Sequence, residues 1–496
     1  AADVTFADGA DIITASAGTS NVRVGVNAGN SITSGGNYNV VVGDEAGTAL
    51  TTGDGNVAVG FEALSTEDAN SFNVGIGYRA LKTLNAGADG YNIGIGYDAG
   101  TAMTTGVQNT IVGAFAGDAL TDADFNVALG ILALTDETKG SKSVAVGYAS
   151  LGDSNFTTST DTFNTAVGYS SGRLITTGIE NTLVGAKAGD ALTDADFNVA
   201  LGYLSLSADT LGSQSTAIGY ATLAAQNFTT ATNAYNVAVG SQAGNDITTG
   251  TFNTLVGGLA GDAITTGTRN IAVGYNALGA DTLGSKSVAV GLGALADQNF
   301  TTATDAFNTA VGHGAGTATT TGTNNTLIGG LAGDAITTAT DSTFVGYLAG
   351  SATVDGNHNT GIGSNALAAN TGGQNTAVGR DALAANTSAS FNTAVGRSAG
   401  AALTEGNRNV AIGKDSLLTD TLGSRSVAVG LGTLQSQNFT TATDAYNTGV
   451  GHAAGNATTT GVQNSLVGGL AGDALTTGQQ NTVLGYSALT ADTTGI

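Results

Sequence analysis

Short runs of alternating apolar and small residues return along almost the whole chain, and most of them open with Asn and close with Gly. Residues 109–113 read Asn-Thr-Ile-Val-Gly, and residues 143–147 read Ser-Val-Ala-Val-Gly. Alternation with a period of two indicates a β-strand, so Val144 and Val146 share one strand face and Ala145 lies on the other. The density of Gly, Thr, Asn and Val disfavours helix.

The closing glycine of each run, called here the marker glycine, recurs at a constant spacing over most of the chain, as from Gly113 to Gly130 and from Gly130 to Gly147. A short fixed period means that one structural unit stacks on copies of itself. We therefore predict an all-β fold, a parallel β-solenoid of about 26 coils with a 17-residue period. Each coil is expected to hold two short strands, the second in segments such as residues 49–53, with glycines at both corners supplying positive φ angles.

A coil this thin encloses few side chains, and small residues suit its interior. Ala145 and its equivalents on the second strand face then need cover, which favours assembly with other chains. The Asn that opens the runs is expected to form a structural ladder of stacked amides, each pairing with the copies above and below. The ladder includes Asn109, Asn126, Asn164, Asn181 and Asn198.

A four-coil super-repeat lies over this shorter period. Four of the irregular coils are lengthened and carry a loop that reads Asn-Phe-Thr-Thr, at residues 155–158, 227–230, 299–302 and 438–441. Because insertions in solenoids project from one face, we expect adhesive contacts in these loops. The candidate contact residues are Phe156, Phe228, Phe300 and Phe439. The chain divides into residues 1–20, a cap or inter-subunit contact segment with strands at 4–6 and 12–14, and the repeat domain, residues 21–496.

Other aromatic residues occupy two fixed places in the coil. Tyrosines that follow the marker glycine are expected to be exposed and suit glycan or protein contacts, although stiffening of the corner explains them equally well. They are Tyr78, Tyr97, Tyr148, Tyr203, Tyr275, Tyr347 and Tyr486. The phenylalanines that precede the ladder Asn, such as Phe125, Phe163 and Phe197, are expected to pack against neighbouring coils.

Charge and composition narrow the list of partners. The chain carries 14 basic and 38 acidic residues and a formal charge of -24, which repels nucleic acid. It has no Cys, so disulfides and thiolate metal sites are excluded. No apolar run approaches the roughly 20 residues that span a bilayer. The first residues suggest a processed N-terminus, consistent with secretion. The last residues stop in mid-pattern, so we expect the C-terminal coil to abut the N-terminal segment of the next copy.

Candidate chemistry is sparse. A cluster of carboxylates is a weak calcium candidate, with a solvated acidic edge as the alternative. It comprises Asp118, Asp122, Asp124, Asp190, Asp194 and Asp196. Three scattered histidines cannot repeat a catalytic triad, and no helix follows the Gly-x-Gly matches, so neither catalysis nor a cofactor is expected. Paired threonines, such as Thr104 and Thr105, raise the alternative of an ice-binding surface.

The runs at 143–147, 236–240 and 409–413 resemble the head repeats of trimeric autotransporter adhesins. The pattern over 308–326 is similar to repeats of phage tail fibres and bacterial surface proteins that end in an endosialidase-type chaperone domain. The resemblance covers residues 21–496 and implies a left-handed parallel β-roll, three chains side by side, and a place on a cell or virion exterior. This coil is longer than the adhesin unit, and we expect no coiled-coil stalk, membrane anchor or chaperone domain within these repeats.

Together these observations favour a non-enzymatic structural subunit of an extracellular filament or of an adhesive surface fibre. It would associate with itself, as a homotrimer or a head-to-tail filament, and with a host-surface glycan or protein. The alternatives are a phage tail-fibre shaft and an ice- or glycan-binding solenoid.

Overall fold

The computed structural model describes residues 16–495, in two compact units, Ala1–Asn236 and Val237–Ile496. The two strands expected at 4–6 and 12–14 lie outside the described residues. Strands and turns make up the described part of both units, with no helix. Accordingly, no helix among residues 16–495 has the length and apolar character needed to cross a membrane.

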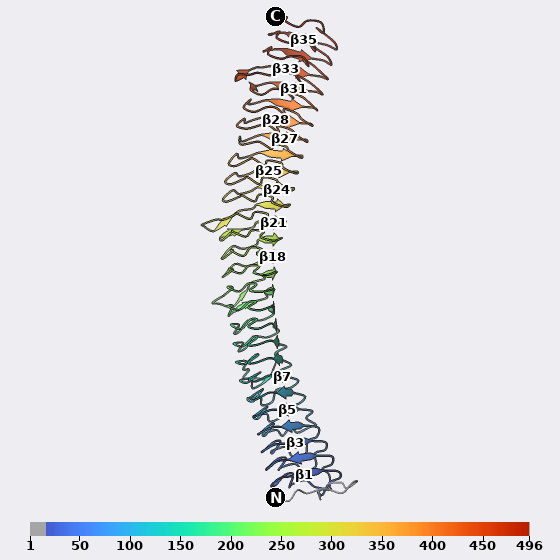
Figure 1. Cartoon of the computed structure of the whole chain (residues 1–496), viewed down its shortest axis with the longest axis vertical. Coiled ribbons are helices and arrows are strands. Elements are labelled where there is room, and N and C mark those ends of the chain that lie inside the picture. Colours follow the sequence, from blue (N-terminus) through green and yellow to red (C-terminus); the bar gives the residue numbers. More distant parts are fainter. Residues whose placement is uncertain (1–15, 496) are drawn as a thin grey trace, which may run out of the picture. The chain divides into compact units, whose positions relative to one another are not determined.

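Each coil contributes one strand of three residues to a parallel sheet (Figure 1). In the first unit these strands are β1 (Val22–Val24), β2 (Val40–Val42), β3 (Val57–Val59), β4 (Val74–Ile76), β5 (Ile93–Ile95), β6 (Thr110–Val112), β7 (Val127–Leu129), β9 (Val144–Val146), β11 (Thr165–Val167), β12 (Thr182–Val184), β13 (Val199–Leu201) and β15 (Thr216–Ile218).

In the second unit the three-residue strands are β17 (Val237–Val239), β18 (Thr254–Val256), β19 (Ile271–Val273), β21 (Val288–Val290), β23 (Thr309–Val311), β24 (Thr326–Ile328), β25 (Thr343–Val345), β26 (Thr360–Ile362), β27 (Thr376–Val378), β28 (Thr393–Val395), β29 (Val410–Ile412), β31 (Val427–Val429), β33 (Thr448–Val450), β34 (Ser465–Val467) and β35 (Thr482–Leu484).

Within each unit a strand pairs in parallel with the strand of the next coil, in register with the repeat. Thr110 of β6 pairs with Val127 of β7, and Val127 pairs in turn with Val144 of β9. The described chain forms 27 coils, each with one three-residue strand, at a usual period of 17 residues. The predicted parallel β-solenoid is therefore confirmed.

The marker glycine explains why the period is so strict. Gly113 has a φ of 142°, a conformation that side chains rarely adopt, and a Cβ there would lie 2.3 Å from the carbonyl oxygen of Gly130 in the next coil. The glycines at the second corner serve a different purpose from the one predicted. Gly106 does not need a positive φ, but a Cβ there would lie 2.5 Å from the carbonyl oxygen of Ala123.

The second strand predicted in each coil is absent from most of the described coils, and only the coils around the four loops hold a second short strand. In segments such as 49–53 the chain turns, and it joins the next coil through single hydrogen bonds, as from the Thr51 N–H to the Asp68 carbonyl at 2.6 Å. Side-chain hydroxyls reinforce this seam, because Thr104 Oγ1 donates to the Thr121 carbonyl at 3.1 Å. The paired threonines of the sequence therefore use hydroxyls to join coils.

Two positions three residues apart share the interior of the coil, and the residue type at the first is linked to that at the second. We call this relationship the volume exchange. Where the first position is Gly, as at Gly117, the second is usually a large apolar residue such as Leu120, and a Cβ on Gly117 would lie 2.6 Å from Leu120 Cδ1. Where the first position is Leu, as at Leu134, the second is almost always polar, as at Glu137. All four of Leu120, Leu134, Glu137 and the strand residue Ala128 are buried.

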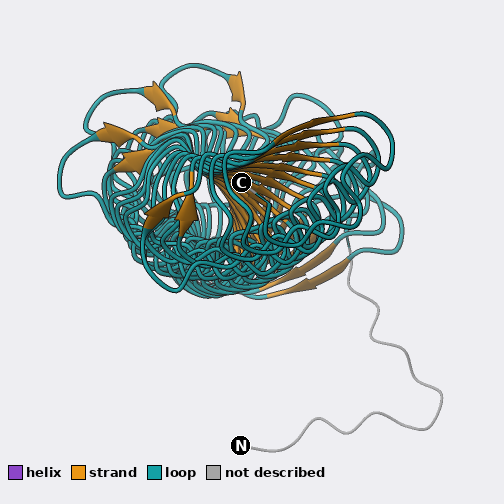
Figure 2. Ribbon diagram, turned by 90° about the horizontal axis from the view of Figure 1, so that it is seen from above, coloured by secondary structure: helices purple, strands orange, loops and turns teal. Residues whose placement is uncertain are grey.

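Each of the four coils lengthened to 21 residues carries a short strand at the periphery of the coils, and this strand pairs with one in the preceding coil (Figure 2). In the first unit β8 (Gly140–Ser141) pairs with β10 (Thr160–Asp161), and β14 (Gly212–Ser213) pairs with β16 (Thr232–Asn233). In the second unit β20 (Gly284–Ser285) pairs with β22 (Thr304–Asp305), and β30 (Gly423–Ser424) pairs with β32 (Thr443–Asp444).

Candidate functional site

The outward face of the strand sheet is apolar, and this reverses the expected orientation. Ala145 is fully buried, whereas Val144 and Val146 on either side of it are half-buried and face outward. In this coil the buried Leu151 of the turn takes up interior space, so the strand contributes only the small Ala145, whereas other coils place Ile111 or Phe344 at the inward strand position. The third strand residue is Val, Ile or Leu in every described coil. The face that needs cover is therefore aliphatic and not made of Ala.

The tyrosines that follow the marker glycine are exposed, as predicted. Tyr97 is 48% exposed, and its ring stacks on that of Tyr78 with centroids 5.0 Å apart and planes at 8°. Phe61 extends the stack at 5.4 Å from Tyr78, and Phe115 closes it edge-on against Tyr97. Since neighbouring rings cover each other's faces, the stack presents mainly ring edges to solvent. That geometry suits hydrogen bonds from phenol groups better than stacking of a sugar ring.

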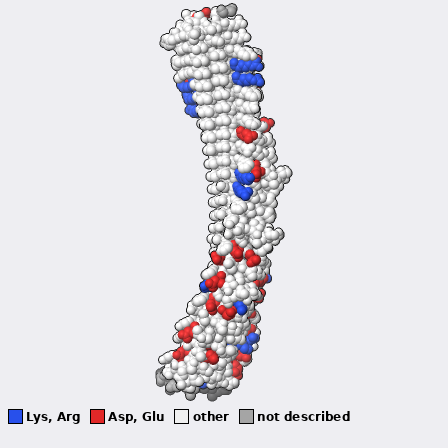
Figure 3. Space-filling model, turned by 180° about the vertical axis from the view of Figure 1, so that it is seen from behind, with Lys and Arg blue, Asp and Glu red and all other residues white. Residues whose placement is uncertain are grey.

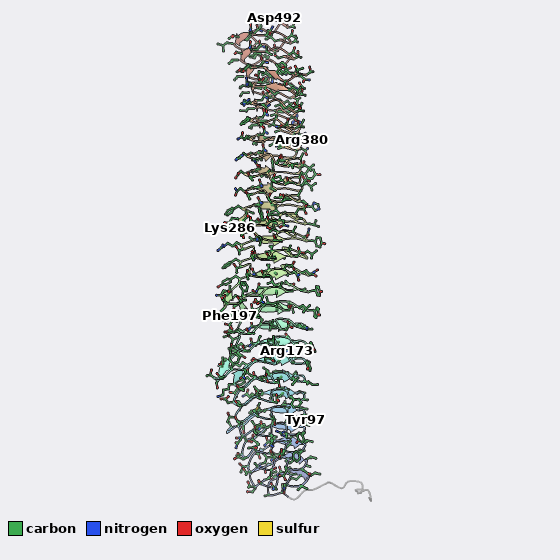
Figure 4. All side chains as sticks on the ribbon, turned by 90° about the vertical axis from the view of Figure 1, so that its left-hand side faces the viewer. Tyr97, Arg173, Phe197, Lys286, Arg380 and Asp492 are labelled. Carbon is green, nitrogen blue, oxygen red and sulfur yellow. The ribbon has the colours of Figure 1, made fainter. Side chains whose placement is uncertain are left out.

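The phenylalanines before the ladder Asn lie half-exposed at the surface, and Phe163 packs against Lys142 of the preceding coil, in line with the expectation of contacts with neighbouring coils. Phe125, Phe163 and Phe197 are 46%, 51% and 45% exposed. Each has a positive φ, which turns its side chain away from the coil. Phe197 precedes its strand and Tyr97 follows its strand, so the two aromatic columns run along opposite edges of the sheet, one at the start of the strands and one at their end. Both residues are labelled in Figure 4.

At the bases of three loops a Lys or Arg side chain lies over the aromatic ring that precedes the ladder Asn. Lys142 forms a 2.6 Å ion pair with Asp161 and lies 5.2 Å from the ring centroid of Phe163. The same arrangement recurs with Lys286 over the Phe307 ring, and with Arg425 over the ring of Tyr446. These contacts fasten each loop to the coil that precedes it. Charged side chains form separate groups on the face drawn in Figure 3, with uncharged surface between them.

The four loop phenylalanines predicted as adhesive contacts are buried, so this assignment is corrected. Phe156, Phe228, Phe300 and Phe439 are only 7%, 5%, 4% and 5% exposed. The Phe228 ring packs against Gly212 of the preceding coil, where an added Cβ would lie 2.7 Å from Phe228 Cδ2. These side chains anchor the loops and are not available to a partner.

A buried carboxylate holds each loop from the preceding coil, and this residue was missed at the sequence level. Asp209 Oδ1 accepts hydrogen bonds from the N–H groups of Gly212 at 3.0 Å and Phe228 at 3.2 Å. Burial raises the pKa of the Asp209 carboxyl above its ordinary value, and a hydrogen bond from Gln226 opposes the shift. Equivalent acids hold the other loops: Glu137, Asp281 and Asp420. The polar residue after Leu in the volume exchange was the available signal.

The ladder asparagines are buried and stacked, but their bonding differs from the prediction. Asn109 Oδ1 accepts from the backbone N–H of Asn126 at 2.9 Å, and Asn109 Nδ2 donates to the Ala123 carbonyl at 2.8 Å. Direct amide-to-amide bonds are weaker additions, such as that from Asn181 Nδ2 to Asn164 Oδ1 at 3.3 Å. Asn198 makes the same two backbone bonds, to the Ser215 N–H and the Gly212 carbonyl.

Five of the six candidate calcium ligands accept a hydrogen bond from another coil. Asp118 accepts from Thr135 Oγ1 at 2.7 Å, and Asp194 accepts from Thr177 Oγ1 at 2.6 Å. Backbone N–H groups of the preceding coil donate to Asp124 and Asp196 at 2.8 Å. The remaining two are Asp122, which accepts from the Ser159 hydroxyl, and Asp190, whose pKa burial raises. Among residues 16–495 no three His, Asp or Glu side chains gather into a metal-binding group.

Searches of this chain against protein-family models, curated proteins and solved structures gave no match.

Proposed function

We propose that the chain is a non-enzymatic structural subunit of an extracellular filament or adhesive surface fibre, and that it associates with copies of itself through the outward face of its strand sheet. The observation that carries the proposal is the aliphatic third strand position, which repeats in every described coil. Val311, Ile328 and Val395 are 36%, 39% and 37% exposed, so each strand adds apolar surface to one continuous face within its unit. Contiguous exposed apolar surface of this kind is typical of protein interfaces.

The bonding between coils supports a role under tension. Every strand shares backbone hydrogen bonds with its neighbours, and where the ladder residue is Asn, as at Asn109, its side chain adds two bonds to the junction. A pull along the stack must therefore break many bonds at one junction together. A stack held by its own repeats needs no pocket to do its work.

Electron microscopy of the purified full chain under native ionic conditions tests the proposal. We expect fibres or laterally associated bundles. The paired variant Val311→Lys and Val345→Lys places two charges on the sheet face and should abolish association. Thr302→Lys, which adds a charge to an exposed loop residue, is the matched control and should associate normally. Isolated monomers of the unsubstituted chain at all concentrations would refute the proposal.

The shaft of a phage tail fibre is the alternative within the same structural class. It predicts a virion-attachment or chaperone domain encoded beside this repeat in the full gene. For an adhesive fibre, a glycan array probed with the full chain tests the exposed tyrosine edges.

Ice binding is a second candidate, favoured by one region. In six successive coils, β23 to β28, the outward strand residues are Thr at the first position and Val or Ile at the third. They form rows of hydroxyl and methyl groups repeating at about 4.8 Å, the spacing of paired strands. Thermal hysteresis of the full chain, lost in Thr343→Lys and kept in Thr302→Lys, is the expected result. No hysteresis in the unsubstituted chain would remove this candidate.

A further inference from the structure

The four loops of the lengthened coils carry Asn-Phe-Thr, the sequence pattern of an N-glycosylation acceptor. Side chains alternate along this segment. In the first loop Asn155 and Thr157 are exposed, while Phe156 between them is buried. The same order of exposed, buried and exposed residues recurs at 227–229, 299–301 and 438–440. The anchored Phe thus holds the Asn amide and the Thr hydroxyl on one outward side.

The amide nitrogen of each loop Asn is free, although its oxygen is engaged. Asn155 Oδ1 accepts from Thr138 Oγ1 at 3.0 Å, and Thr210, Thr282 and Thr421 make the same bond in the other loops. Among the described residues, Nδ2 makes no hydrogen bond at Asn155, Asn227, Asn299 or Asn438. Nδ2 is the atom that an N-linked glycan would occupy.

Three other Asn-x-Ser/Thr sequences provide an internal comparison, and none leaves an accessible free amide nitrogen. Asn324 Nδ2 donates to Asp341 Oδ1 at 3.1 Å. Asn386 is fully buried. Asn456 Nδ2 donates to the Gly432 carbonyl at 3.0 Å and to Gln435 Oε1 at 2.9 Å. Of the seven acceptor sequences in the chain, the structure distinguishes the four that lie in projecting loops.

We propose that Asn155, Asn227, Asn299 and Asn438 carry N-linked oligosaccharides. This inference rests on the proposed extracellular role, because such transfer accompanies export. The donor is a pyrophosphate-linked oligosaccharide, used by a separate transferase. Nδ2 forms a bond to the anomeric carbon, the bond from that carbon to the pyrophosphate oxygen breaks, and the pyrophosphate leaves with the electron pair. Nδ2 loses one proton in the exchange.

Glycans at these positions would stand away from the sheet face. The loops lie at the periphery of the coils, and a buried acid holds each attachment point, with an ion pair added at the base of three of the four loops. Bulky hydrated groups there leave the aliphatic face free for association with copies of the chain.

Glycopeptide mass spectrometry on the full chain, purified from the cells that secrete it, tests the proposal. We expect a sugar mass on each of the four loop asparagines and none on Asn324, Asn386 or Asn456. Thr157→Ala keeps Asn155 and its bond to Thr138, yet should abolish the modification at Asn155. Thr157→Ser should retain it. Thr158→Ala, a change at the adjacent exposed threonine, should also leave it intact.

Two results would overturn the inference. One is an unmodified mass at all four asparagines in the secreted chain. The other is modification at Asn155 that persists in Thr157→Ala. Electron microscopy of the same preparation separates the two proposals: fibres built from unmodified chains would reject glycosylation and leave the structural role standing.

Discussion

Gln226 Nε2 donates a 2.6 Å hydrogen bond to Asp209 Oδ2, one coil earlier in the stack. Both side chains are fully buried, and Gln226 also donates to the Ser215 hydroxyl at 3.0 Å. The same pair recurs as Asp281 with Gln298 and as Asp420 with Gln437. Each of these buried carboxylates thus accepts a hydrogen bond from a glutamine of the next coil, which is the coil that carries the loop.

Replacing Gln226 by Leu should loosen the loop without unfolding the unit. Asp209 Oδ2 would lose its donor inside the coil, at a cost of about 1–3 kcal/mol. Because strand pairing joins each coil to its two neighbours, the loss should appear as faster hydrogen exchange in residues 205–233 and not elsewhere. Gln374→Leu, a change at an exposed glutamine, should leave exchange unaltered. Equal exchange in both variants would contradict the role given to the pair.

Glu67 is expected to make its unit less stable as pH rises. It is fully buried, and its Oε2 has no hydrogen-bond partner among the described residues. The next coil supplies a donor, Gln226, to Asp209, but it has the apolar Leu84 at the equivalent position beside Glu67. Burial raises the pKa of Glu67 to about 7 from 4.5. The unfolded chain therefore releases the proton first, and stability falls between pH 4.5 and about 7, by about 3 kcal/mol in total, and is level above pH 7.

Hydrogen exchange of residues 60–90 between pH 4 and 8, corrected for the intrinsic rate, measures this dependence. Glu67→Gln removes the titrating group, so its opening free energy should be flat over the same range. A slope that persists in the variant would assign the effect to another group.

The volume exchange predicts that two substitutions compensate. Gly117→Leu alone should cost about 1–3 kcal/mol, because the new side chain meets Leu120 in the filled interior. Gly117→Leu with Leu120→Asn recreates the pairing of Leu383 with Asn386 and should recover part of the loss. A double-mutant cycle, measured by local exchange, gives the coupling energy. Strictly additive effects would show that the two sites do not share one space.

Asn126 should be more sensitive to Ala than to Ser. Its Oδ1 accepts from the Ser143 N–H at 2.8 Å, and its Nδ2 donates to the Gly140 carbonyl at 2.9 Å. Asn126→Ala leaves both backbone groups buried without partners, at about 1–3 kcal/mol each. Asn126→Ser copies the Ser that replaces Asn at Ser143 itself, so a smaller loss is expected. Differential scanning calorimetry of the two variants compares them, and an equal shift would contradict the ladder's role.

The period of the marker glycine was enough to predict the solenoid, because a positive φ and contact with the next coil allow only Gly at positions such as Gly113. Strand orientation was not predictable from alternation alone. Alternation separates Ala145 from Val146, but which of them faces inward depends on how much space the turn residues take. The space that the turn residues take can be inferred only when the Gly or Leu of the turn is considered together with the residue three places later.

Side-chain roles in the loops were also beyond a reading of residue types. Phe156 occurs in a polar segment that resembles an exposed contact, yet its ring is buried. Asp209 resembles any surface acid in the sequence, and only stacking brings Gln226 and the Phe228 N–H to it. Local pattern predicts backbone shape well here, whereas burial depends on contacts made with the neighbouring coil.

Among the described strands β6 pairs with β5 and β7 alone, so the sheet joins each coil to its two neighbours. Residues 117–130 and 189–202 are identical in sequence and lie one super-repeat apart. Unequal recombination between the two gene segments would insert or delete a whole super-repeat. Each coil would still contact a neighbour with a sequence that already occurs next to it in the present chain. Length is therefore a trait that this gene can change in single genetic steps, separately from the slow substitution of its amino acids.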